Sequence, residues 1–120
     1  MNVENLRTLA DYLLRPKLEA SFDMNEYAEN GYTPHMTCGS VGCAVGHGPY
    51  AGILPLAGEL WHQYSDRAFG ADTVEWCFSS TWRRYDNTPE GAAHRILYLL
   101  KHGKPPKEWD YEQYQEGWWR

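Results

Sequence analysis

The chain has 120 residues, of which 42% are hydrophobic and 15% aromatic, and its formal net charge is −5. This length suffices for one hydrophobic core, and the composition excludes a disordered chain. The negative charge, with no basic stripe along the sequence, argues against a nucleic acid as the partner.

The first predicted element is an amphipathic helix that begins after Asn2 and ends before Pro16. Asn2 is a suitable N-cap, and a proline cannot continue a helix. Apolar side chains recur at the helical spacing along this segment, which predicts that they share one buried face. They are Val3, Leu6, Leu9, Ala10, Leu13 and Leu14.

Two less regular segments follow. Residues 22–27 predict one short helical turn with Asp23 as its cap, and residues 29–34 have the composition of a turn. The stretch from Thr37 to Gly48 is rich in glycine and predicts a helix over residues 39–47. Such a helix start would offer free backbone N–H groups to an anion.

The second half of the chain predicts three further helices. Residues 59–69 form the first, with Gly70 as its C-cap, and residues 73–78 form a short buried one. The clearest signals belong to the third, in which Thr88 is the N-cap, Pro89 and Glu90 occupy the first turn, and Gly103 follows the end. Its expected buried face consists of Ala92, Ala93, Ile96, Leu97 and Leu100.

No segment alternates with the two-residue period of a strand, so any sheet is a minor element. We therefore predict an all-α fold, a small compact single domain of about four to six helices over residues 1–106. Residues 107–120 form an aromatic and acidic tail. Five large rings are unusual in a disordered tail, so we expect it to pack on the domain or on a second protomer.

Several short motifs within residues 2–106 form a distinctive set. They are Asn5-Leu6-Arg7-x-Leu9-Ala10-x-Tyr12-Leu13, Phe22-Asp23-Met24, Cys38-Gly39-Ser40-x-x-Cys43-Ala44-x-Gly46-His47, Phe69-Gly70, Trp76-Cys77-Phe78-Ser79-Ser80 and Asp86-Asn87-Thr88-Pro89-x-Gly91-Ala92-Ala93-x-Arg95-Ile96. The set resembles a family of small proteins encoded by phages and bacteria. The resemblance implies that the protein is encoded by a phage or prophage and acts in the cytoplasm of a bacterial host cell. It does not imply a particular activity.

The sequence gives no sign of export or of a membrane anchor. The polar start leads us to expect no signal peptide, and no apolar run approaches the roughly 20 residues that span a bilayer. Three cysteines, an odd number, favour reduced thiols. We expect a cytoplasmic protein with no membrane partner.

Two kinds of chemistry are possible around the glycine-rich stretch. His35, Cys38, Cys43 and His47 are zinc-type ligands, although their spacing is not that of a regular zinc site. Cys38 at a helix start would also be a candidate thiolate nucleophile, with His35 or His47 as its base. The simpler interpretation is that the cysteines pack as small buried side chains, so we expect no metal and no cofactor.

A second constellation lies in residues 82–88. The Trp82 ring could stack on a base, the guanidinium groups of Arg83 and Arg84 could bind phosphate, and the Asn87 amide could contact a base or ribose. The alternative is a surface loop in which Asp86 and Thr88 cap the next helix. The candidate ligand-binding residues are Gly39, Ser40, His47, Tyr50, Trp82, Arg83, Arg84, Asn87 and Arg95.

Some small phage proteins bind the nucleotide messengers of host immune systems such as Thoeris and CBASS and so withhold them. By analogy with these phage proteins, we expect a binding protein without turnover. Its ligand would be a cyclic ADP-ribose isomer, an ADP-ribose conjugate or a cyclic dinucleotide, and it would be a homo-oligomer. The alternatives are a protein–protein inhibitor or scaffold that acts through the aromatic tail, and a small enzyme that cleaves such a signal.

Overall fold

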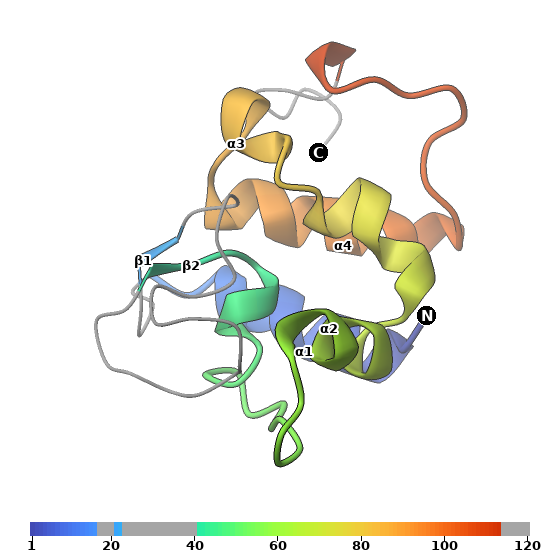
Figure 1. The fold of residues 1–120 in the computed structure, drawn as a ribbon. Helices are drawn as coiled ribbons and strands as arrows, with labels where there is room; N and C mark the ends of the chain where they lie inside the picture. The colour runs from blue at the N-terminus through green and yellow to red at the C-terminus, as the bar shows by residue number, and fades with distance from the viewer. Residues whose placement is uncertain (17–20, 23–40, 114–120) are drawn as a thin grey trace.

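The computed structural model describes residues 1–16, 21–22 and 41–113, and four α-helices organise this part of the chain (Figure 1). The predicted all-α fold is confirmed. The α-helices are α1 (Val3–Leu13), α2 (Trp61–Ala68), α3 (Trp82–Tyr85) and α4 (Pro89–His102). Three short helical turns lie between them, η1 (Val45–His47), η2 (Ala71–Thr73) and the π-helical η3 (Val74–Phe78).

Helix α4 lies across the middle of the molecule, with α1 and α2 on one side and α3 on the other (Figure 1). Its ends are those that the sequence predicts. The Thr88 hydroxyl accepts the Gly91 N–H at 3.0 Å, and Gly103 ends the helix with φ at +75°. The inward face carries Ala92, Ala93, Ile96 and Leu99, all buried, whereas Leu97 and Leu100 are only partly covered.

Helix α1 packs against α4 through leucines. The Asn2 side chain accepts the Asn5 N–H at 3.0 Å, which is the predicted N-cap. Leu6, Leu9, Ala10 and Leu13 are fully buried as predicted. The same prediction was wrong at the two ends, because Val3 is 52% and Leu14 42% exposed. Both residues lie at the ends of the predicted segment, and Tyr12 completes the buried face instead.

The predicted glycine-rich helix over residues 39–47 is not formed in the part that the structure describes. Val41–Gly42 is instead a strand, β2, which pairs in parallel with β1 (Ser21–Phe22), so Phe22 is extended rather than helical. Only η1 is helical, as a single 3-10 turn. Glycines lower helix stability, and the strand pairing gives the backbone other hydrogen-bond partners. Residues 23–40 lie outside the described residues.

Helix α2 begins at Trp61, two residues later than predicted, and buries Trp61, Tyr64 and Ala68. The predicted helix over residues 73–78 is present as η2 and η3. Its Trp76, Cys77 and Phe78 are buried.

The first part of the C-terminal tail folds back onto the domain. The Trp109 ring lies 5.0 Å from that of Trp76, between ring centroids, and the Tyr111 hydroxyl lies 3.0 Å from the Ser79 hydroxyl. Figure 1 shows the chain after α4 returning to the side of α3. This part of the tail therefore covers the aromatic core, and residues 114–120 lie outside the described residues.

An ion pair between the buried Glu59 carboxylate and the Arg67 guanidinium, whose side chain is 38% exposed, holds the loop before α2. The Glu59 side chain is 7% exposed, and its Oε2 lies 2.6 Å from Nε of Arg67. The same carboxylate accepts the Leu56 N–H at 2.9 Å, and Arg67 Nη2 donates to the Leu54 carbonyl at 3.2 Å. The hydrogen bond from Arg67 holds the pKa of Glu59 below its ordinary value despite burial.

This lowered pKa predicts a pH-dependent contribution of the pair to stability. The contribution is present at neutral pH, above the pKa of the unfolded carboxyl, and is lost as the pH falls through the lower pKa of the folded state. At neutral pH, Glu59→Gln is expected to cost about 1–2 kcal/mol, since Arg67 stays partly solvated. Melting curves of both proteins should therefore converge in acid. Glu75→Gln, at an exposed position, is the control, and a difference that does not change with pH contradicts the assignment.

Candidate functional site

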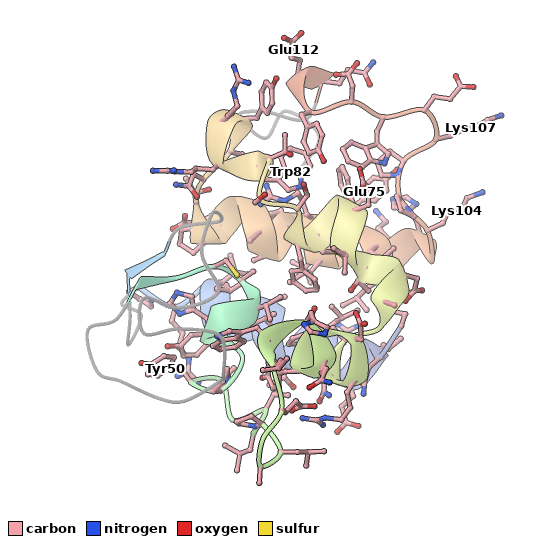
Figure 2. All side chains as sticks on the ribbon, in the orientation of Figure 1. Tyr50, Glu75, Trp82, Lys104, Lys107 and Glu112 are labelled. Atoms are coloured by element: carbon pink, nitrogen blue, oxygen red, sulfur yellow. The ribbon has the colours of Figure 1, made fainter. Side chains whose placement is uncertain are left out.

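The predicted ligand-binding residues fall into two separate groups. His47 and Tyr50 lie near the strands, whereas Trp82 and its sequence neighbours lie at α3, on the other side of α4 (Figure 2). Gly39 and Ser40 lie outside the described residues. The structure therefore does not bring His47 and Tyr50 together with the Trp82 group, and each group is considered by itself.

Trp82 belongs to the core. Its side chain has 0% exposure, and its Nε1 donates to the Trp76 carbonyl at 2.8 Å. Trp76 Nε1 in turn donates to the Arg95 carbonyl at 2.8 Å, which joins η3 to α4. The Trp109 ring stacks near Trp82 at 5.8 Å between centroids. In this packed arrangement the Trp82 ring has no surface to offer a ligand.

Arg95 is also inside the protein rather than part of a surface basic spot. Its exposure is 0%, and its guanidinium carbon lies 4.2 Å from the Trp82 ring centroid. Its Nη1 lies 3.4 Å from Oδ2 of Asp86, whose side chain is 5% exposed. The tryptophan ring and the carboxylate together compensate the buried charge.

The motif around Asp86 has an architectural explanation. The Thr88 hydroxyl donates to Asp86 Oδ1 at 2.6 Å while it caps α4. A Cβ atom added to Gly91 would overlap the Asp86 carboxylate, so the helix approaches this group closely only with glycine there. Asp86, Thr88, Gly91 and Arg95 thus form one buried unit, and capping explains more of this motif than ligand binding does.

Residues in and after α3, with one residue of the returning tail, are at least partly exposed, and we call them the arginine face: Arg83, Arg84, Tyr85, Asn87 and Tyr111. Both arginines are exposed, and Asn87 and the two tyrosines are partly buried. The Tyr85 and Tyr111 rings stack at 5.7 Å between centroids, with 15° between their planes. Sequence reasoning missed both tyrosines, because only the returning tail brings residue 111 beside α3.

The arginine face has a rigid base. Trp82, one residue before Arg83, is fixed in the core by its hydrogen bond and its ring contacts. Tyr111 is fixed by its contact with Ser79. Guanidinium groups bind phosphate oxygens in pairs of hydrogen bonds, and phenol rings stack on planar bases. These groups can bind a small anion that carries both a phosphate and a planar base.

The second group is more enclosed. His47 has 0% exposure, and its ring lies 6.0 Å from that of Tyr12 and 6.2 Å from that of Tyr50, between centroids. Tyr50 is partly buried. This histidine is part of an aromatic contact that joins η1 to α1, and no ligand contact is required to explain its burial.

The described part of the chain contains two of the four residues of the metal and thiol hypotheses, Cys43 and His47. No three His, Cys, Asp or Glu side chains gather there as metal ligands. His35 and Cys38, the other two residues of the zinc and nucleophile hypotheses, lie outside the described residues. Cys43 and Cys77 are buried, and burial raises the pKa of the Cys77 thiol to about 12.

This raised pKa predicts that Cys77 resists alkylation in the folded protein. Thiolates react and thiols do not, so iodoacetamide at mildly alkaline pH is expected to leave Cys77 unmodified until the chain is unfolded. Peptide mass spectrometry with and without urea measures this. Cys77 modified in the native protein as fast as in urea contradicts the buried position.

Comparison of the chain with protein-family models, with curated proteins and with solved structures gives no match in any of the three. None of the helices in the described part of the chain has the length and apolar character that crossing a membrane requires.

Proposed function

We propose that this protein binds and sequesters a small nucleotide-derived signal, and that the arginine face receives it. The candidate ligands are a cyclic ADP-ribose isomer, an ADP-ribose conjugate and a cyclic dinucleotide. The observation that carries the proposal is that α3 exposes two consecutive arginines, Arg83 and Arg84, directly before Tyr85, whose ring stacks with that of Tyr111. The phage resemblance supplies the context of host immunity.

The charge distribution supports a small anion over a polymer. The chain carries a net charge of −5, which repels long polyanions. Two guanidinium groups suffice for one or two phosphates, because each forms charge-assisted hydrogen bonds. The amide of Asn87, which follows α3, can read a base or ribose edge.

The proposal is binding without turnover. The arginine face offers guanidinium, phenol and amide groups, which bind and orient but are poor nucleophiles at neutral pH. Compared with the binding residues that the sequence suggests, the proposed site keeps Arg83, Arg84 and Asn87. It gains Tyr85 and Tyr111, and it assigns Trp82 and Arg95 to the supporting core.

Thermal melting with a ligand panel tests the function. The panel is cyclic ADP-ribose, ADP-ribose and cyclic di-GMP, with adenosine and inorganic phosphate as controls. At 100 times its dissociation constant, a ligand is expected to raise the melting temperature by roughly 10 °C. Chromatography of the recovered ligand should show it intact. No shift with any nucleotide contradicts the proposal, and recovered fragments contradict binding without turnover.

A further inference from the structure

The returning tail forms a small turn of its own around Tyr111. The Asp110 side chain accepts the Gln113 N–H at 3.0 Å, and the Gln113 side chain accepts the Asp110 N–H at 3.3 Å. Such a reciprocal pair of hydrogen bonds closes a turn locally. Pro106 is buried, so the tail is also anchored to the domain shortly after α4 ends. The tail therefore presents the Tyr111 ring from an ordered backbone.

The Tyr111 ring lies where the aromatic core meets the surface. Its centroid is 4.8 Å from that of Trp82 and 4.9 Å from that of Trp109, both in edge-to-face arrangements, which are favourable for aromatic pairs. It is 5.7 Å from the Tyr85 centroid in a stacked arrangement. Trp82 is fully buried, whereas Tyr85 and Tyr111 are only partly buried. The core thus holds one edge of a ring whose exposed part is open to a ligand.

One hydroxyl links this ring to the start of α3. The Tyr111 hydroxyl donates to Ser79 Oγ at 3.0 Å, and the same Oγ accepts the Thr81 N–H at 3.2 Å. Thr81 is the N-cap residue of α3, and Tyr85 is the last residue of that short helix. Ser79 therefore connects the tail, which carries one ring of the stacked pair, to the helix that carries the other.

We infer that Ser79 is a positioning residue for the base of a nucleotide ligand, an inference that rests on the proposed function. Its hydroxyl fixes the Tyr111 ring relative to Tyr85, and these phenol rings are the groups that can stack on a base. A ring that is held in place before binding costs less to order in the complex. The phosphates are assigned to Arg83 and Arg84 instead. Ser79 therefore sets the affinity for the base and not the affinity for phosphate.

Isothermal titration of Ser79→Ala with cyclic ADP-ribose and cyclic di-GMP tests this inference. The nucleotide that the wild type binds is expected to bind the variant about 3–10-fold more weakly, because the Tyr111 ring loses the hydrogen bond that fixes it. Ser79→Thr keeps a hydroxyl and should restore most of the affinity. Ser80→Ala is the matched control, since it removes the hydroxyl of the exposed neighbouring serine, and it should bind as the wild type does.

Pyrophosphate separates a role in base binding from a general structural role. Its affinity, measured by competition with the bound nucleotide, is expected to be the same in Ser79→Ala and the wild type, because pyrophosphate has no base to stack on the rings. The Thr81 N–H is exposed, so water can replace its lost acceptor and the start of α3 should be kept. Equal melting curves check that the fold is intact. An equal loss of affinity for pyrophosphate and nucleotide overturns the inference.

Tyr111→Phe removes the other end of the same hydrogen bond and keeps the ring. We expect it to weaken nucleotide binding as Ser79→Ala does, and the double variant should bind no more weakly than Ser79→Ala alone. Losses that multiply in the double variant overturn the inference, because the two hydroxyls then act independently.

Failure of this inference is distinguishable from failure of the proposed function. A wild type that binds none of the nucleotides overturns both. A wild type that binds one of them, with a Ser79→Ala variant of equal affinity, overturns only the role of Ser79. Loss of binding in the Arg83→Ala/Arg84→Ala variant would in that case still support the ligand site.

Discussion

Asp86→Ala is expected to lower the free energy of unfolding by about 3–5 kcal/mol, because it leaves the Arg95 charge buried without its carboxylate. Arg95 has 0% exposure, so water cannot replace the lost partner. The Thr88 hydroxyl also loses the oxygen to which it donates. Against a total stability of about 5–15 kcal/mol for a domain of this kind, the variant should be largely unfolded on mild heating. Urea denaturation followed by tryptophan fluorescence measures the change.

The control for this prediction is Asp66→Ala, which removes an exposed carboxylate and should change stability by about 0.5 kcal/mol or less. Adding Arg95→Met to Asp86→Ala should recover part of the loss, because no unpaired charge then remains in the core. A loss below about 1 kcal/mol for the single variant, or no recovery in the double variant, would show that the pair does not carry the buried charge.

Trp82→Ala is expected to cost about 3–5 kcal/mol, because a fully buried indole is replaced by a cavity. Trp82→Phe should cost less, since it keeps a ring over the Arg95 guanidinium and leaves a smaller cavity, although it loses the hydrogen bond to the Trp76 carbonyl. Thermal and urea denaturation rank the two variants. If Trp82→Ala keeps the wild-type melting temperature and loses only ligand binding, the ring is a ligand platform and its assignment to the core is wrong.

These two predictions decide which residues are suitable for testing function. From the sequence, alanine variants at Trp82 and Arg84 would be chosen to test binding, but the first of them removes a core residue. If a variant with Trp82→Ala no longer binds the ligand, the cause could be unfolding rather than the loss of a ligand contact. Arg83 and Arg84 are exposed, so their replacement tests the ligand site with the fold intact.

The helices with complete end signals were predicted well from the sequence. For α4, Thr88, Pro89 and Gly103 specify both ends locally, and the apolar period gives the buried face. For α1, Asn2 does the same at the start. These signals act within a few residues along the chain, so no knowledge of the tertiary contacts is needed.

The predictions that failed depend on contacts between distant segments. Trp82 and Arg95 have the residue types of a nucleotide site, and only their packing against Trp76, Asp86 and Trp109 shows that they are interior. A buried arginine is rare without a partner, so sequence alone favours a surface position. The glycine-rich stretch failed for a related reason, since the pairing of Val41–Gly42 with another strand competes with a helix.

Isothermal titration of the Arg83→Ala/Arg84→Ala double variant with cyclic ADP-ribose and cyclic di-GMP tests the central claim most directly. The control is Lys101→Ala/Lys104→Ala, which removes the same charge at the far end of α4, where Figure 2 shows Lys104. We predict that the ligand bound by the wild type binds the arginine variant at least ~100-fold more weakly, since two charge-assisted contacts are lost, and the lysine variant unchanged. Equal affinity in the arginine variant, or an equal loss in both variants, would contradict a ligand site on the arginine face.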